Sequence, residues 1–190
     1  MQEAYLQDQT FESIDYTQNA LEKGEYDTCI FNNCNFVYTN LSGFKFTNCT
    51  FNSCNLSLVK LSKTALRDIK FKNSKLLGLK FDTCNDLGLS FSFDNCQLNH
   101  SSFYKTKIKK TTFKNSQLME VDFTECDLSS SLFDNCDLSG TTFDKSILEK
   151  ADFRTAYSYS INPEQNKIKK AKFSINGIVG LLHKYGIDIE

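Results

Sequence analysis

Residues 111–138 read TTFKNSQLMEVDFTECDLSSSLFDNCDL, and every fifth position in this stretch is a phenylalanine or a leucine. The same line of large apolar residues runs from Phe93 to Phe153, and an earlier line runs from Leu6 to Phe81. A period of five matches neither the 3.6 residues of a helical turn nor the two-residue alternation of a strand. It requires a bend in every repeat, with one large side chain turned inward each time.

The residue two positions before each large residue forms a second inward column. It is small or β-branched in most repeats, and all eight cysteines fall in this column. They are not at the CxxC spacing of metal sites, and we expect buried structural thiols with no disulfide and no bound metal. The eight are Cys29, Cys34, Cys49, Cys54, Cys84, Cys96, Cys126 and Cys136.

Phenylalanine also recurs every twenty residues, in one series from Phe11 to Phe91 and in another from Phe93 to Phe173. Twenty residues therefore make one coil with four sides, and equivalent side chains stack in successive coils. Neighbouring strands lie about 4.8 Å apart, so eight or nine coils give a rod on the order of 40 Å long. The two series are offset by two residues, which predicts a two-residue insertion near 84–93.

Segments such as FTECDL and FDNCDL resemble the pentapeptide-repeat family, whose repeat is written A(D/N)LXX. The resemblance implies an all-β fold, a right-handed quadrilateral β-helix. We expect this solenoid over residues 1–173, with degenerate repeats at 1–25 and 156–172. We call the large inward residue of each repeat its central residue. Asparagine recurs two residues after the central residue, and we expect it at the corners because it tolerates left-handed backbone.

Residues 174–190, SINGIVGLLHKYGIDIE, predict a short helix and tail that cap the last coil. Ser174 is a candidate N-cap and Gly186 a candidate helix stop, after which apolar and acidic residues alternate as in a short strand. The ending LLHKYGIDI resembles that of the bacterial Qnr and MfpA-type members, which dimerise through it. The resemblance implies a homodimer through Ile178, Leu181, Leu182, Tyr185, Ile187 and Ile189.

Composition and motifs argue against several classes of protein. The chain is nearly neutral at −1, and no apolar run approaches the ~18 residues of a membrane span. Because its first residues also lack the basic and apolar parts of a signal peptide, we expect a cytoplasmic protein without a membrane partner. The two histidines, at an outward corner (His100) and on the terminal helix (His183), have no catalytic or ligand spacing. We therefore expect no enzyme, no cofactor and no metal.

Charge is segregated along the chain. Residues 1–27 carry seven acids and one lysine, 60–80 carry seven bases and one acid, and 105–114 are also basic. Residues 119–144 hold seven acids and no base, a span longer than one coil, so we call them the acidic belt. Its members are Glu120, Asp122, Glu125, Asp127, Asp134, Asp137 and Asp144.

The belt has two interpretations. Outward positions of a solenoid must be polar, and blocks of one sign are then ordinary solvated surface, as on a structural or protein-interaction scaffold. Alternatively, the Qnr resemblance implies a mimic of duplex DNA that binds DNA gyrase or topoisomerase IV and counters quinolones. A C-terminal dimer would then place two belts near its centre. Direct nucleic-acid binding through 60–80 is a third interpretation that we do not expect, because no exposed aromatic residues alternate with those lysines, as in proteins that bind single strands.

Overall fold

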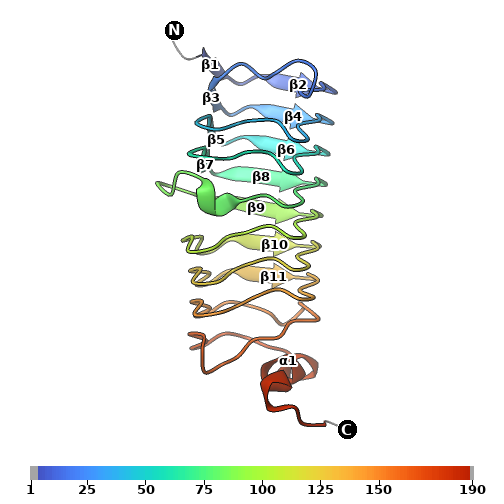
Figure 1. Ribbon diagram of the computed structural model, residues 1–190, viewed down its shortest axis with the longest axis vertical. Coiled ribbons are helices and arrows are strands. Elements are labelled where there is room, and N and C mark those ends of the chain that lie inside the picture. The colour runs from blue at the N-terminus through green and yellow to red at the C-terminus, as the bar shows by residue number, and fades with distance from the viewer. Residues whose placement is uncertain (1–3, 189–190) are drawn as a thin grey trace.

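The computed structural model describes residues 4–188, which wind into a four-sided, right-handed β-solenoid (Figure 1). One side is a parallel sheet of β1 (Ala4–Gln7), β3 (Gly24–Asp27), β5 (Lys45–Thr47) and β7 (Ala65–Arg67). The next side is a longer parallel sheet. Its strands are β2 (Thr10–Glu12), β4 (Ile30–Asn32), β6 (Thr50–Asn52), β8 (Ile69–Lys72), β9 (Phe91–Asp94), β10 (Thr112–Lys114) and β11 (Leu132–Asp134).

Paired residues in neighbouring coils are twenty apart before β8, and the remaining sides are joined by single bridges of the same spacing, such as Asn35 with Asn55. The predicted twenty-residue coil is therefore confirmed.

Stacked phenylalanine rings fill the core of the rod. The ring centroids of Phe31 and Phe51 are 4.8 Å apart, and those of Phe113 and Phe133 are 4.9 Å apart. Rings on adjacent sides meet edge to face, as Phe113 meets Phe123 at an interplanar angle of 77°. Burying a side chain of this size stabilises a fold by about 1.5–3 kcal/mol, so the repeated stack is the main source of stability.

Polar residues of the repeat shape its corners. The predicted corner asparagines adopt left-handed backbone, with φ of 53° at Asn33 and 52° at Asn135. The Asp or Asn immediately before the central residue has a different function. Its side chain accepts a hydrogen bond from the amide two residues later, as Asp137 does from Ser139 at 3.0 Å. The Asp or Asn of the repeat therefore serves mainly to close the turn, and its effect on surface charge is secondary.

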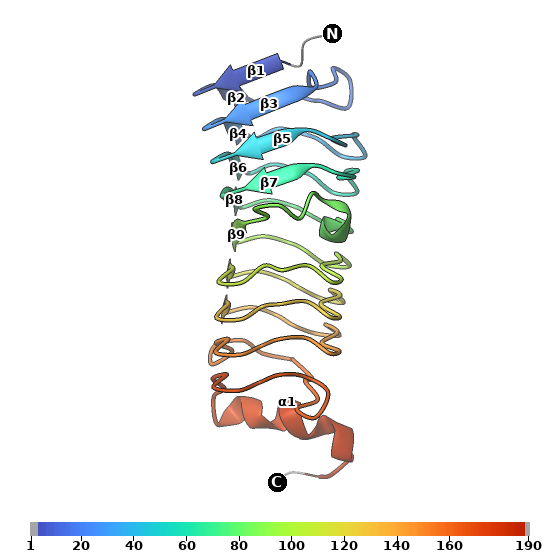
Figure 2. The same ribbon diagram turned by 90° about the vertical axis from the view of Figure 1, so that its left-hand side faces the viewer.

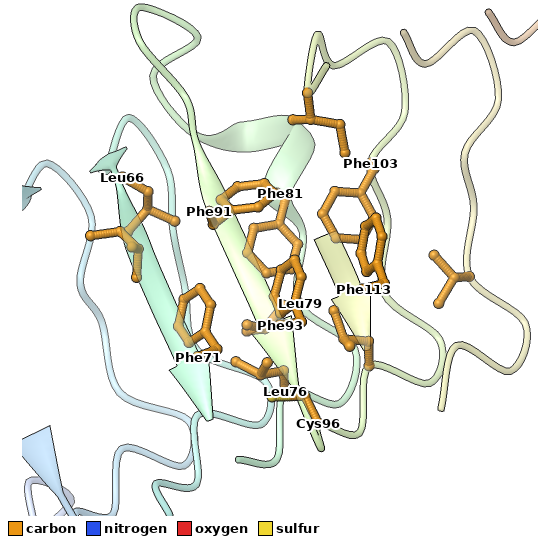
Figure 3. Close-up of a cluster of buried hydrophobic side chains, with 14 of the residues drawn as sticks. Leu66, Phe71, Leu76, Leu79, Phe81, Phe91, Phe93, Cys96, Phe103 and Phe113 are labelled. Atoms are coloured by element: carbon orange, nitrogen blue, oxygen red, sulfur yellow. The ribbon is translucent and has the colours of Figure 1, made fainter. Parts of the chain in front are cut away.

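The regular spacing changes once, between β8 and β9. Phe71 pairs with Phe93, an offset of 22 residues, and the intervening chain forms the short helix η1 (Phe81–Thr83) and a loop through Gly88. The loop is held by Arg67, whose Nε donates to the carbonyl of Leu87 at 3.2 Å. Figure 3 shows the phenylalanine cluster packed around this irregular coil.

Phe91 does not continue the first phenylalanine series, so that prediction is wrong at its last member. Phe93 stacks on Phe71, with ring centroids 5.3 Å apart, while Phe91 lies opposite Ile69 in the column of small and β-branched residues. A large side chain is accommodated in that column where the coil is widened by its two extra residues.

Seven of the eight cysteines are buried in the small column, and Cys84, in the irregular coil, is half-buried. The prediction of an inward position is therefore only partly met at Cys84. The thiols of the first four cysteines in the column donate to backbone carbonyls of the coil before, as Cys49 Sγ does to the Tyr26 carbonyl at 3.3 Å. Burial raises the pKa of Cys49 and of Cys126 to about 12, which keeps both as unreactive thiols.

The C-terminal segment lies across the open end of the last coil (Figure 2). It consists of η2 (Asn176–Ile178), α1 (Val179–Leu182) and η3 (His183–Tyr185), so the predicted helix is largely of the tighter 3₁₀ type. Ser174 Oγ accepts a hydrogen bond from the Gly177 amide at 3.0 Å, and Gly186 ends the helix with φ of 58°. Gly186 is therefore confirmed as the helix stop, whereas Ile175 holds the N-cap position and Ser174, one residue earlier, bonds to the first turn.

A glycine allows the helix to lie close against the solenoid. A Cβ on Gly180 would be 2.3 Å from the carbonyl oxygen of Tyr159, and the Gly180 carbonyl accepts from the Ile161 amide at 2.9 Å. The short strand predicted after Gly186 does not form over residues 186–188, and Ile189 lies outside the described residues. None of the helices in the described part of the chain is long and apolar enough to cross a membrane.

Candidate partner-binding surfaces

The acidic belt surrounds the rod instead of lining one side. Asp134 extends from β11, and Asp127 and Asp137 precede the central residues of two other sides. Glu120 and Glu125 stand at corners with left-handed backbone, with φ of 54° and 55°. The predicted belt therefore exists as a ring of carboxylates, but no single side presents most of them.

Bases in the preceding coil pair with three of the belt carboxylates. Glu120 is 3.1 Å from His100 Nδ1, and Glu125 is 3.6 Å from Lys105 Nζ. Asp127 is 3.1 Å from Lys109 Nζ, and its side chain is only 12% exposed. The basic stretch at 105–114 and the acidic belt thus face each other across adjacent coils.

Hydrogen bonds within a coil or from the next coil hold further belt carboxylates. Asp122 accepts from the Thr124 amide at 2.8 Å, and Asp134 accepts from the hydroxyl of Thr155 in the next coil at 2.9 Å. Within residues 4–188, Asp144 is the belt carboxylate with no hydrogen bond or ion pair to its side chain.

Asp127 has the densest surroundings. Burial opposes its ionisation, but hydrogen bonds from the hydroxyl and amide of Ser129, together with the ammonium of Lys109, outweigh burial and lower its pKa. This carboxylate is therefore firmly ionised and is held in a structural role.

The predicted dimer residues are partly exposed at the C-terminal end. Ile178, Tyr185 and Ile187 are 45%, 54% and 56% exposed, whereas Leu182 is half-buried and Leu181 packs against the core. Leu181 therefore belongs mainly to the cap.

Two apolar residues that sequence reasoning left out of the interface are also exposed at this end. Ile175 is 87% exposed and Val179 is 40% exposed, at the helical spacing that brings them beside Ile178. We call the exposed residues the apolar end face: Ile175, Ile178, Val179, Tyr185 and Ile187.

Seven exposed lysines gather along one side of the later coils. They occupy three columns, because 107, 127, 147 and 167 are joined by consecutive bridges and the residues two and three positions later follow the same register. We call this surface the lysine face. Its members are Lys107, Lys109, Lys110, Lys150, Lys167, Lys169 and Lys170.

Sequence reasoning missed the lysine face because its members are spread over 64 residues. The twenty-residue period of phenylalanine, applied to charge, would have found it. The bases of 60–80 behave in the opposite way: they are close in sequence and so fall on different sides of one coil, as Lys60, Lys70 and Lys75 do.

The order of charge toward the C-terminus also differs from expectation. Residues 145–172 carry seven bases and three acids, and they lie between the acidic belt and the apolar end face. In a C-terminal dimer, basic coils would therefore flank the centre and the belts would lie farther out.

Comparison with known proteins shows to which family this architecture belongs. The family model described as "Pentapeptide repeat region" matches residues 24–92 and 89–157. Among curated proteins nothing matches. Full-length QnrB1, a plasmid-mediated fluoroquinolone resistance protein, is similar with a TM-score of 0.62 and 15% identity, covering 97% of this chain and 100% of that one.

Its trypsin-treated form matches equally well, with a TM-score of 0.62 and 15% identity, covering 98% of this chain and 100% of that one. HetL from the cyanobacterium Nostoc sp. strain PCC 7120, a pentapeptide-repeat protein involved in regulation of heterocyst differentiation, is 14% identical with a TM-score of 0.37, covering 93% of this chain and 87% of that one. Repeat, coil geometry and family model agree, and the chain belongs to the pentapeptide-repeat family.

Proposed function

We propose that this protein is a non-enzymatic binding rod that associates with DNA gyrase or topoisomerase IV and protects it from quinolones. The observation that carries the proposal is the likeness in fold to QnrB1, which spans 97% of this chain. A rod with stacked, charged outer columns has the shape and surface that a groove built for DNA accepts.

In this proposal the acidic belt supplies the charge that meets the enzyme. Two of its carboxylates, Glu120 and Glu125, already pair through exposed side chains with His100 and Lys105, whereas Asp127 is largely buried beside Lys109. Ion pairs between exposed side chains stabilise a fold by only about 0–1 kcal/mol, so the enzyme's bases can replace them at little cost. Binding through exposed charges weakens as salt rises, because screening acts over about 8–10 Å.

A scaffold without topoisomerase activity is the second candidate, and the internal pairing of the belt favours it. Carboxylates that close turns or pair with the next coil have a structural reason to be present. Under this alternative the rod binds another protein through the apolar end face.

A gyrase supercoiling assay with ciprofloxacin separates the two candidates. We expect wild-type protein to restore supercoiling, and a variant with six belt carboxylates changed to amides to lose that protection. Amides keep the oxygen that closes each turn, so the fold is retained. The six are Asp122, Glu125, Asp127, Asp134, Asp137 and Asp144.

The matched control removes the same charge at the other end of the rod and should protect as wild type does. It changes Asp8, Glu12, Asp15, Glu22, Glu25 and Asp27 to amides. Protection that survives the belt variant rejects the belt as the binding surface. Wild-type protein that neither binds nor protects the host's own gyrase and topoisomerase IV rejects the proposal in favour of the scaffold.

A further inference from the structure

The lysine face combines three columns of side chains on one straight side of the rod. The column that begins at Lys110 continues through Ser130, Lys150 and Lys170, and all four residues have left-handed backbone with φ near 60°. Because each stands at the same corner of its coil, Lys150 and Lys170 project side by side, about 4.8 Å apart at the backbone.

Within residues 4–188, six of these seven lysines have no ion pair. Lys109 is the member that pairs with a carboxylate, Asp127, and Glu149 is the other acid among the columns. The face therefore carries a net positive charge that the rod itself does not neutralise, unlike the charges of Lys105 and Arg154, which pair with Glu125 and Asp152.

The geometry points to a partner, and we propose that the lysine face binds the phosphodiester backbone of duplex DNA. The span from Lys107 to Lys167 covers three coil spacings, about 14 Å, and that length of duplex carries about eight phosphates. The lysines lie in the coils at 107–110, 147–150 and 167–170, so they can contact a straight polyanion at both ends of this span. This inference goes beyond the proposed function and does not rest on it.

The neighbours of the lysines favour duplex DNA over other polyanions. No aromatic residue occurs at 107–110, 127–130, 147–150 or 167–170, so the face lacks the rings on which single-stranded bases stack. The apolar side chains of Ile147 and Ile168 are half-buried, so the face also lacks the exposed apolar residues that insert into a membrane surface.

Fluorescence anisotropy with a labelled 24-base-pair duplex at 50 mM salt tests the proposal. We expect wild-type binding, and we expect it to weaken by about tenfold or more when four lysines of the face are changed to glutamine. The slope of log affinity against log salt should fall by about three to four, near 0.9 for each phosphate that is no longer neutralised. The four are Lys150, Lys167, Lys169 and Lys170.

The matched control removes four lysines from the ring at 60–80 and gives the same net charge. In this variant Lys60, Lys70, Lys72 and Lys75, which lie on three sides of one coil, become glutamine, and binding should stay within about threefold of wild type. Circular dichroism verifies that both variants keep the fold. We expect this result because the exposed lysines do not stabilise the solenoid. Equal losses in the two variants overturn the proposal, as does the absence of wild-type binding. Co-sedimentation with phosphatidylserine vesicles in the absence of DNA binding assigns the face to membranes and also overturns it.

Discussion

The acidic belt and the lysine face are opposite ways of arranging charge on one rod. The belt is continuous in sequence, within residues 119–144, and its carboxylates are distributed around all sides. The lysine face is dispersed in sequence, from 107 to 170, yet it gathers on one side. In a solenoid with four sides, charges adjacent in the chain encircle the rod, and charges one coil apart share a side.

Charge blocks also have a consequence for stability, because the nearest neighbours of a coil are the coils before and after it. His100, Lys105 and Lys109 each pair with a belt carboxylate 18 to 20 residues later. Alternating basic and acidic blocks along the sequence thus become complementary rings in space. The segregation of charge along the sequence, which suggests a partner surface, thus also places opposite charges next to each other in adjacent coils.

A dimer through the apolar end face would sharpen the comparison, because it would bring two basic ends together and keep the belts apart. We expect the wild type to dimerise and the double variant Ile178→Asp with Val179→Asp to be monomeric. Each buried side chain contributes about 1.5–3 kcal/mol, so the dissociation constant should rise about 100-fold or more. Light scattering and analytical ultracentrifugation at micromolar concentration measure it.

The control for this experiment changes two equally apolar residues far from the end face. Tyr38 and Leu87 are each 71% exposed, and changing both to aspartate should leave the dimer intact. A monomeric wild type, or equal dissociation of the two variants, would show that the end face is only a cap.

Two belt carboxylates with different surroundings provide a smaller but more selective test. Asp137 accepts from both the amide and the hydroxyl of Ser139, at 3.0 and 2.6 Å, whereas Asp144 has no such partner in the described chain. We expect Asp137→Ala to lower the free energy of unfolding by about 1 kcal/mol, and Asp144→Ala to change it by less than about 0.5 kcal/mol.

Urea denaturation measures both values, and Asp137→Asn should recover most of the loss because its amide oxygen still accepts. If the two alanine variants are equally stable, the belt residues before the central position are surface charges without a turn function.

The sequence predicted the coil, the four sides, the corner asparagines and the helix stop, because each depends on local spacing and backbone preference. It misplaced Phe91, since two extra residues shift the register and only the paired strands show that Phe93 continues the stack. Leu181 is partly buried against the core, which helical spacing could not predict because it does not say which face of the helix meets the solenoid, and its place in an interface stays a prediction.

The turn function of Asp122 and Asp137 was also missed, since a carboxylate in a charged run was interpreted as surface charge alone. The lysine face was missed for a related reason. Its members share a side only after the twenty-residue period is applied to charge as well as to phenylalanine.

The most direct test of coil-to-coil charge pairing is the pKa of Asp127, measured by NMR in wild type, Lys109→Gln and Lys110→Gln. The folded-state pKa lies below the unfolded value of about 3.9, so this carboxylate stabilises the fold above that pH, and the stabilisation is lost as pH falls through the folded pKa. Lys109→Gln removes the ammonium 3.1 Å away and should raise the pKa of Asp127, whereas Lys110→Gln, which removes a corner lysine, should leave it nearly unchanged. An Asp127 pKa that is the same in Lys109→Gln as in wild type, or one that rises equally in both variants, would contradict charge pairing between adjacent coils.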